Sequence, residues 1–408
     1  MTCEVAVMNK RGVALAADSA VTLGDGEKVY LTAEKLFPVS SANGAGASIV
    51  PVGIMTYGAA DIMGVPWETV VKLYAHKLGQ RQFDRLEQYA QDFLRFVEGS
   101  QVLFPGPVQR RFFRLSVGSY WFQFYLNPLN DLLEKNPEDR KRAAAVLAEL
   151  IDKDSEDTRT NCPMLEELGE GYGDRVVEEY AAELGELEEE IFGDFKFPKD
   201  IGQRLRESVK LMVTRNIFGE FSSTVVFAGM GEAEALPALF QYRVGTLVAG
   251  RLRFAKIDEA RVDHDTDAVV VPMAQRQVID MFYGGIWPEL RPKLVEIAHS
   301  CLFDKTNGGG RKAAEKMRKD FEESFNDALN REIRESYTAS LINAVGGLPR
   351  QELAGLAEAL VSITIFVAKM SAGKRETVGG PIDVALISKG DGFVWVKRKQ
   401  QMQGFSIG

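Results

Sequence analysis

The spacing of hydrophobic and polar positions changes several times along the chain, and each change predicts a different kind of element. Apolar runs at residues 5–8 and 13–17 flank Asn9-Lys10-Arg11-Gly12, whose turn-forming residues predict a β-hairpin. Two further short runs, at 35–39 and 49–55, predict additional strands. The chain is therefore expected to open with strands, starting with an adjacent pair.

Helical spacing follows from Pro66 onward and is repeated over residues 83–97 after a polar break, which predicts a pair of helices. Later in the chain, β-type patterns predict strands at 224–228, 238–244 and 268–271. Helical patterns then predict helices at 276–302, 311–336 and 351–369. A second hairpin is predicted at the end, where 382–388 and 393–398 flank Lys389-Gly390-Asp391-Gly392.

This order of strands, helices, strands, helices and strands does not suit a simple parallel βαβ repeat. It suits two stacked antiparallel sheets covered by helices on both outer faces. We therefore predict an α+β protein, a four-layer αββα sandwich with helical insertions. The core is expected from residues 1–100, 201–290 and 345–408, with an acidic helical insertion at 101–200 and a helical insertion or extension at 291–344.

Length and composition agree with a folded protein that carries insertions. The 408 residues are 45% apolar and 26% charged, and a single core usually stops growing near ~250–300 residues. The formal charge of −9 makes nucleic acid an unfavourable partner. Residues 149–194 hold 17 acidic and three basic side chains, so the acidity is local. A solvated charged face and a binding surface for a basic partner are both open interpretations of this segment.

Metal and disulfide chemistry are not indicated. The cysteines and histidines lie far apart, at Cys3, Cys162, Cys301, His76, His264 and His299. No spacing among them matches a zinc site, a redox pair or a disulfide framework, and we expect neither a metal nor a cofactor. Such cysteine usage is typical of a reducing cytoplasm.

Nucleotide binding and membrane insertion are not indicated either. Residues 368–375 approach a phosphate-binding loop, but they lack its first glycine and place Arg375 where a hydroxyl should bind magnesium. The start of the chain has no basic segment of the signal-peptide type, and no run of ~18 uninterrupted apolar residues is present. We expect a cytoplasmic protein without a membrane partner.

Thr2 is the candidate for the chemistry. A hydroxyl is a weak nucleophile, and an N-terminal threonine can activate it with its own α-amino group. That amine has a pKa of ~7.7–8.0, close to working pH, whereas a peptide nitrogen is no usable base. The hypothesis therefore requires that Met1, the first residue of the sequence, is removed.

Asp18 and Lys35 are the candidates to support such a nucleophile. A fixed positive charge held by a carboxylate keeps the amine neutral and favours the developing alkoxide. Both residues lie at the ends of predicted strands, from which they could meet the start of the first strand. On spacing alone, the simpler interpretation is that Asp18 is a turn residue and Lys35 an exposed strand lysine.

The segments around these residues resemble a known family. They are Thr2-Cys3-Glu4-Val5-Ala6-Val7, Gly12-Val13-Ala14-Leu15-Ala16-Ala17-Asp18-Ser19, Val21-Thr22-Leu23-Gly24 and Glu34-Lys35-Leu36. Their order and near-spacing are similar to the opening of proteasome β-subunits and of the HslV peptidase, which are N-terminal nucleophile (Ntn) hydrolases. The resemblance implies a divergent, bacterial-type homologue with large helical insertions, in which Thr2 is the nucleophile and Asp18 and Lys35 support it.

The same resemblance implies substrate-binding positions. The backbone of Thr22 would pair with the substrate, and the turn at Tyr57 and Gly58 would supply the backbone N–H of the oxyanion hole, with Tyr57 where the family has glycine. It further implies a homo-oligomer, as a ring or a related assembly, that acts on peptides or proteins. The sequence specifies no unfoldase or regulator.

Two functions are therefore weighed. The first is a threonine-type Ntn hydrolase, a peptidase or amide-bond acyl transferase that works without metal or nucleotide. The second is a catalytically inactive structural or scaffold subunit. The second arises because Arg375 and Val378 occupy positions where proteasome β-subunits usually have an aspartate and a serine near the final double glycine.

Overall fold

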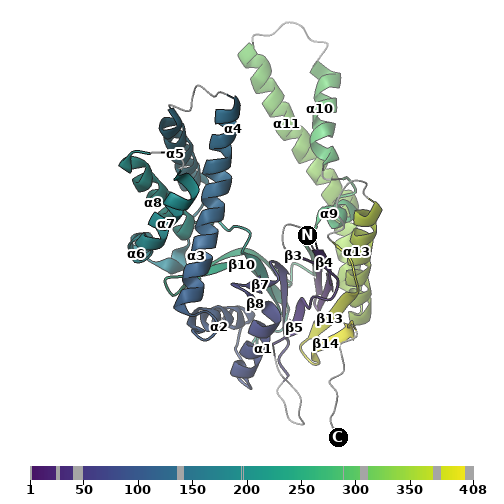
Figure 1. Cartoon of the computed structure of the whole chain (residues 1–408). Coiled ribbons are helices and arrows are strands. Elements are labelled where there is room, and N and C mark those ends of the chain that lie inside the picture. Colours follow the sequence, from purple (N-terminus) through teal and green to yellow (C-terminus); the bar gives the residue numbers. More distant parts are fainter. Residues whose placement is uncertain are drawn as a thin grey trace.

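The computed structural model describes residues 2–23, 28–39, 49–135, 142–193, 195, 197–287, 289–303, 311–370 and 378–399. The protein is a mixed α+β structure, which confirms the predicted class (Figure 1). Two five-stranded sheets form its centre, and two-stranded sheets lie beside them. The paired strands in all of them run antiparallel.

The first large sheet has the strand order β12-β1-β2-β13-β14. Its central strands are the predicted N-terminal hairpin, β1 (Cys3–Asn9) and β2 (Gly12–Asp18), both fully buried. The flanking strands come from the last third of the chain and are β12 (Ala268–Ala274), β13 (Ile382–Ser388) and β14 (Gly392–Lys397). The two ends of the chain therefore meet in one sheet.

The second large sheet has the order β11-β10-β9-β6-β5. Its strands are β5 (Leu36–Pro38), β6 (Val52–Gly58), β9 (Ser223–Gly229), β10 (Ala238–Val248) and β11 (Arg251–Arg261). Gly229 has a φ of +136°, and a Cβ there would lie 2.0 Å from the carbonyl oxygen of Pro51, so only glycine fits where β9 meets β6. The small sheets are β3 (Val21–Leu23) with β4 (Lys28–Tyr30), and β7 (Asp61–Ile62) with β8 (Val65–Pro66).

Alternation along β1 separates two packing environments. Ala6 and Met8 point into an apolar cluster shared with the second sheet, which also contains Met55 and Val226. The intervening positions, including Val5, belong to a cluster with the C-terminal helices. Because successive strand residues point to opposite faces, β1 contributes to both clusters, and Glu4 and Thr2 share the parity of Ala6.

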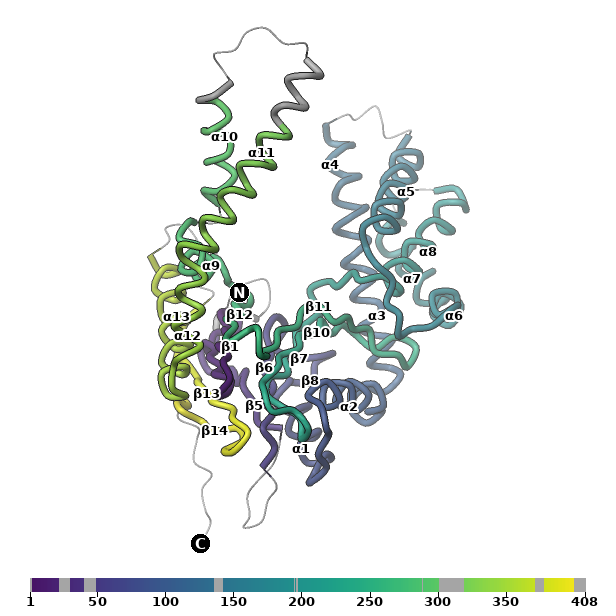
Figure 2. Tube along the Cα trace, turned by 180° about the vertical axis from the view of Figure 1, so that it is seen from behind, coloured from purple at the N-terminus to yellow at the C-terminus, as the bar shows by residue number. Residues whose placement is uncertain are grey.

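Helices cover both sheets (Figures 1 and 2). Helices α12 (Ala339–Gly347) and α13 (Arg350–Met370) pack on the first sheet, whereas α1 (Trp67–Leu78) and α2 (Leu86–Gly99) pack on the second. By length and composition α13 is also apolar enough to cross a membrane, with a mean hydropathy of 1.7. Its buried side includes Leu353 and Val361, which contact the sheet, as expected of a core helix.

The predicted insertion at 101–200 is helical and has an apolar cluster of its own. The helices of this group are α3 (Gly106–Trp121), α4 (Asn127–Lys135), α5 (Ala143–Asn161), α6 (Tyr172–Glu179), α7 (Ala181–Phe192) and α8 (Lys199–Thr214), the last of which extends past residue 200 into the stretch predicted as core. A π-helical turn, Phe122–Leu126, joins α3 to α4, and a 3₁₀ turn, Glu166–Leu168, precedes α6. The division of the chain into a core and two insertions stays a prediction.

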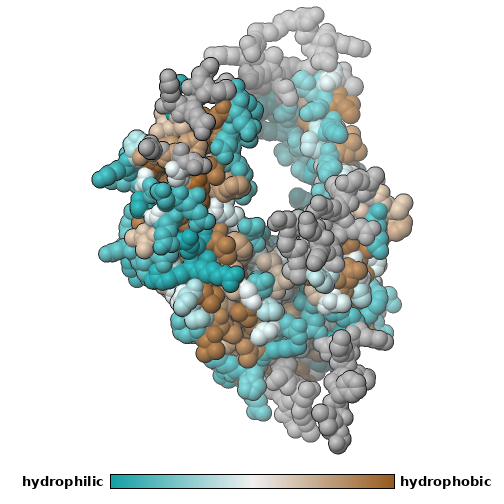
Figure 3. Space-filling model, viewed as in Figure 1, coloured by the Kyte–Doolittle hydropathy of each residue, from teal (hydrophilic) through white to brown (hydrophobic). Residues whose placement is uncertain are grey.

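A second helical group projects beside the first large sheet (Figure 2). It contains α9 (Gln277–Gly284), α10 (Leu290–Phe303), α11 (Arg311–Ile333) and the π-helical turn Arg334–Thr338 that leads to α12. Figure 3 shows a hollow between this group and helices α3–α8. The N-terminal end of the chain lies at the base of that hollow in both ribbon views.

Arg253 joins the helical insertion to the second sheet, and among the described residues its partners are backbone carbonyls and no carboxylate. Its side chain is 5% exposed and donates to the carbonyl oxygens of Val213 (3.0 Å), Met212 (2.5 Å) and Ile217 (2.7 Å). Burial lowers the pKa of Arg253 to about 10, so the guanidinium stays charged at neutral pH. The charge is therefore balanced by carbonyl dipoles in the last turn of α8 and just after it.

Replacing Arg253 with methionine is expected to lower the free energy of unfolding by ~3 kcal/mol or more. The substitution leaves these buried carbonyls unpaired, and each unsatisfied group costs ~1–3 kcal/mol. Urea unfolding followed by circular dichroism measures the loss. Arg251→Met is the matched control on the same strand, because Arg251 pairs with Glu98 at the surface and such pairs contribute ~0–1 kcal/mol. Equal losses in the two variants would contradict the role assigned to Arg253.

Candidate functional site

Thr2 lies directly before β1, at the edge of the space between the two large sheets. Its side chain is buried, with 6% exposed, and its Oγ1 donates to Oε2 of Glu4 at 3.1 Å. The two residues are neighbours on one face because they are two positions apart on an extended chain. The carbonyl of Thr2 accepts a hydrogen bond from the N–H of Gln275, which continues the pairing of β1 with β12.

Lys35 reaches this face from the segment before β5. Its Nζ donates to Oδ1 of Asp18 at 2.5 Å and to Oε1 of Glu4 at 3.1 Å. All three side chains are almost completely removed from solvent, and Lys35 is 5% exposed. The structure thus brings Asp18 and Lys35 together beside Thr2, and the alternative of an exposed strand lysine is wrong.

Asp18 holds the surrounding backbone as well as the lysine. Its Oδ1 accepts a hydrogen bond from the N–H of Cys3 at 3.1 Å, and its Oδ2 accepts one from the N–H of Gly379 at 2.8 Å. The carboxylate therefore connects β1, the segment before β5 and the segment before β13. Charge-assisted bonds of this kind are stronger than neutral ones, so the position of Lys35 is well fixed.

The charges of the site depend on one another. Burial raises the pKa of Glu4 to about 7, with Lys35 opposing the shift and Asp18 adding to it. Burial alone would lower the pKa of Lys35, but the attraction of Glu4 and Asp18 outweighs it, so the pKa is raised. Lys35 is therefore a permanent cation at neutral pH, whereas Glu4 is poised between its charged and neutral forms.

A cavity of about 160 Å³ opens next to Thr2 and Lys35, and its walls include Val21, Tyr57 and Gly58. This cavity is where a reacting group could approach the Thr2 hydroxyl. Mostly apolar walls with a few convergent polar groups are typical of ligand-binding sites.

The turn at the end of β6 has a fixed geometry. Gly58 has a φ of +96°, and a Cβ there would lie 3.1 Å from the carbonyl oxygen of Ser222, so a side chain would be strained. The N–H of Ala59 donates to that same carbonyl, so this amide is already used. The hydroxyl of Tyr57 donates to Oε1 of Gln241 at 2.9 Å. Tyr57 and Gly58 thus line the cavity. The tyrosine hydroxyl is already hydrogen-bonded to Gln241 on the neighbouring part of the second sheet.

Of the remaining candidate positions, the structure describes Thr22 and Val378. The backbone of Thr22 lies in β3, paired with Val29, and the adjacent Val21 lines the Thr2 cavity. Val378 is buried, with 3% of its surface exposed, in the cluster with the C-terminal helices. It precedes Gly379, whose N–H donates a hydrogen bond to Asp18. Met1 and Arg375 lie outside the described residues.

Glu4 is the functional candidate that sequence reasoning missed. The sequence pattern assigned it no role of its own. The available signal was a carboxylate directly before the apolar run at 5–8, two residues from Thr2 and thus on the same face. Acidic residues are almost never fully buried unless they are paired, so such a position predicts a cationic partner.

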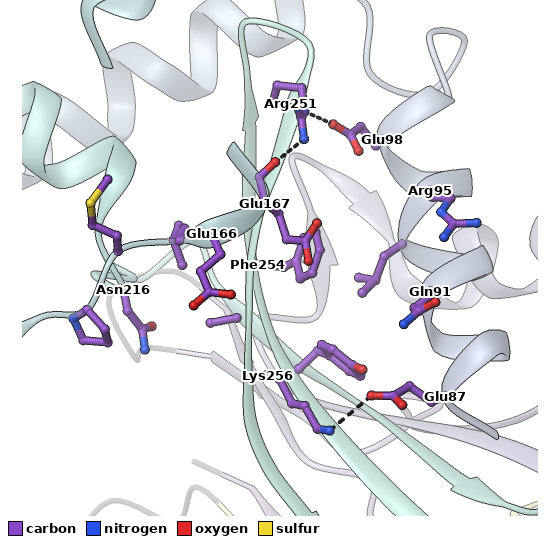
Figure 4. A pocket seen from close by; sticks show the side chains of 16 residues that line it. Glu87, Gln91, Arg95, Glu98, Glu166, Glu167, Asn216, Arg251, Phe254 and Lys256 are labelled. Carbon is purple, nitrogen blue, oxygen red and sulfur yellow. Dashed lines mark hydrogen bonds and ion pairs between the residues drawn. The ribbon is translucent and has the colours of Figure 1, made fainter. Parts of the chain in front are cut away.

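Within the described ranges, no group of three or more His, Cys, Asp or Glu side chains is arranged to hold a metal ion. A larger cavity of about 620 Å³ lies between α2, β11 and the loop at 163–167 (Figure 4). Charged groups in it pair with one another, as Lys256 does with Glu87 at 3.2 Å and Arg251 with Glu98. It shares no lining residue with the Thr2 cavity.

No family model matches the chain, and no curated protein sequence matches it. Among solved structures, the chain is similar to the Anbu (Gly-1) mutant from Hyphomicrobium sp. strain MC1, with 14% identity, a TM-score of 0.29, and coverage of 98% of this chain and 86% of that chain. This is a distant structural similarity to Anbu.

The family assignment made from the sequence, to proteasome β-subunits and HslV, is wrong, because no family model matches the chain and the similarity to a solved structure, Anbu, is low, with a TM-score of 0.29. The assignment rested on short segments of small apolar residues around Thr2, Asp18 and Lys35. Buried hairpins in many folds share such a composition, since a central strand requires small and β-branched residues. The site is therefore judged on its own geometry.

Proposed function

We propose that this protein is a threonine-type N-terminal nucleophile enzyme, a peptidase or amide-bond acyl transferase, in which Thr2 attacks after removal of Met1. The observation that carries the proposal is the position of the Thr2 hydroxyl, which borders a cavity on one side and a buried cluster of Glu4, Lys35 and Asp18 on the other. Nucleophile, proton acceptor and fixed cation are the parts that acyl transfer requires.

The chemistry would proceed in two stages. Oγ1 of Thr2 bonds to the carbonyl carbon of an amide, and the amine then leaves, which gives an ester on Thr2. Water, or another acceptor, then releases the acyl group and restores the hydroxyl. Lys35 contributes a positive charge held by two carboxylates, which favours the negative oxygen that develops during attack. Peptides or proteins as substrates and a homo-oligomeric assembly are part of this proposal.

The arrangement of the elements supports the finer fold proposal. Two antiparallel sheets share an apolar cluster, and each also packs on helices of its own. We propose on this basis the four-layer αββα sandwich with helical insertions that the order of elements predicts. A second candidate function, a noncatalytic structural subunit, is favoured by Val378, an apolar residue that lies beside the contact of Gly379 with Asp18 and offers no hydroxyl to the site.

A threonine-directed electrophile tests the proposed function. We expect a β-lactone to acylate the purified protein once per chain, and peptide mapping by mass spectrometry to locate the adduct on Thr2. Intact mass before the reaction shows whether Met1 has been removed, and chains that keep Met1 should stay unmodified, which makes them an internal control. Processed protein that shows no adduct, or an adduct elsewhere, would favour the noncatalytic alternative.

A further inference from the structure

Glu4 lies between the candidate nucleophile and the buried lysine. Its side chain is fully buried, with 0% exposed. One carboxylate oxygen accepts from the Thr2 hydroxyl at 3.1 Å, and the other accepts from Nζ of Lys35 at 3.1 Å. In the described part of the chain, Thr2 and Lys35 are connected through this carboxylate, with no direct hydrogen bond between their side chains.

We infer that Glu4 is the general base that removes the proton from the Thr2 hydroxyl, so that activation of the nucleophile does not depend on the α-amino group alone. This inference rests on the proposed function. A general base must lie within ~2.6–3.2 Å of the proton donor, and Oε2 of Glu4 meets that condition. Lys35 on the other oxygen fixes the carboxylate and points Oε2 at the hydroxyl.

The proton balance of such a reaction is simple. As Oγ1 of Thr2 bonds to the substrate carbonyl carbon, its proton passes to Oε2 of Glu4. When the carbon–nitrogen bond breaks, the same proton passes to the leaving amine, which leaves an ester on Thr2. Water then attacks this ester while giving a proton to Glu4, and that proton returns to Oγ1 as the ester bond breaks. Each cycle restores Glu4 to its ionised form.

The groups that face Glu4 suit this role. Lys35 and Asp18 face it from other elements, and Cys3 and Tyr57 also lie within electrostatic reach. Burial raises the pKa of both the Cys3 thiol and the Tyr57 hydroxyl, so these two are neutral near pH 7. The charges around Glu4 come from Lys35, Asp18 and, once Met1 is removed, the α-amino group of Thr2, which has an ordinary pKa of ~7.7–8.0. The effects of Lys35 and Asp18 on Glu4 oppose each other, which leaves burial as the main influence.

The expected pH dependence follows from the direction of that shift. Burial raises the pKa of Glu4 to about 7, so below pH 7 the carboxyl holds a proton and cannot accept another. The rate of Thr2 acylation should therefore rise as the pH increases through about 7. A base whose pKa lies near working pH is the most effective, because it is largely ionised and still basic.

The test compares Glu4→Gln with the wild-type protein in acylation by a β-lactone between pH 5 and 9, using chains shown by mass to start at Thr2. Glutamine keeps the size of the side chain but cannot accept the proton. We expect a rate lower by a factor of ~10²–10⁴ and loss of the rise near pH 7. Asp383→Asn is the matched control, since Asp383 is a buried carboxylate in the same sheet that pairs with Lys399 at 2.8 Å. It should keep the wild-type profile.

The outcomes separate this inference from the function on which it rests. If Glu4→Gln keeps both the rate and the profile while Thr2 is still acylated, the base assignment is overturned and the proposed function stands. If processed wild-type protein is not acylated at Thr2, both are overturned. Should Glu4→Gln fail to fold, judged by circular dichroism and gel filtration, Glu4→Asp replaces it. If Glu4 is the general base, the midpoint of the pH profile should shift in Glu4→Asp relative to the wild type. An unchanged midpoint overturns the inference.

Discussion

Thr2→Ala is expected to abolish both hydrolysis of peptide substrates and acylation by a β-lactone. The variant lacks the only hydroxyl that the proposal uses as a nucleophile, and removing a catalytic nucleophile typically costs a factor on the order of 10⁴ to 10⁶ in rate. The fold should persist, because the substitution removes a single side-chain hydrogen bond, to Glu4, which contributes ~1 kcal/mol. Gel filtration and thermal unfolding check that point.

Two companion variants sharpen the result. Thr2→Ser keeps a hydroxyl beside Glu4 and should keep part of the activity. Cys3→Ala should keep most of it, because Cys3 is 0% exposed and packs toward the C-terminal helices with Val5 and Leu353. Burial also raises the pKa of this thiol, so Cys3 stays protonated and unreactive. Acylation that survives in Thr2→Ala but is lost in Cys3→Ala would make the cysteine the reactive residue.

Lys35→Met is expected to have the second largest effect, and it should act on both rate and stability. The substitution leaves the carboxylates of Glu4 and Asp18 buried without a cation, and breaking a buried pair in this way costs ~3–5 kcal/mol. Loss of the preorganised donor should lower the rate of acylation by a factor of ~10²–10³ beyond any loss of folded protein. Urea unfolding and acylation rates measured on the same samples separate the two effects.

Lys35→Arg serves as the comparison. It keeps the positive charge, so its stability should lie closer to that of the wild type, although the planar guanidinium fits a site built for an ammonium less well. If Lys35→Met acylates at the wild-type rate, the charge is not used in the reaction and the lysine has a structural role only. If both variants lose the same stability, geometry rather than charge holds the site together.

The strands nearest the site could be predicted because their sequences fit a buried hairpin and few other structures. The segments that became β1 and β2 are short, apolar and separated by turn-forming residues, which is the pattern of a buried hairpin. β11 was missed. It is the edge strand of its sheet, and four successive residues from Lys256 to Glu259 are exposed, so the apolar alternation that marks a strand fades along it.

The site itself was only partly predictable. Thr2, Asp18 and Lys35 could be selected by chemistry, but their distances depend on which strands pair, and this is not visible in local sequence. Gly379 illustrates the limit, since its amide reaches Asp18 from a point 361 residues away along the chain. The burial of Lys35 is likewise a product of tertiary packing, because the same lysine on an exposed strand would have an identical local sequence.

The carboxylate of Asp18 also sets an order of events during synthesis. It accepts hydrogen bonds from the amides of Cys3 and Gly379, and β2 takes β13 as its neighbour in the sheet. A nascent chain leaves the ribosome with its N-terminus first, so for most of translation the opening hairpin has no β13 to pair with. The contact between Asp18 and Gly379 can therefore form only after residue 379 has emerged, and a product that ends before it would carry the cluster around Thr2 without this support.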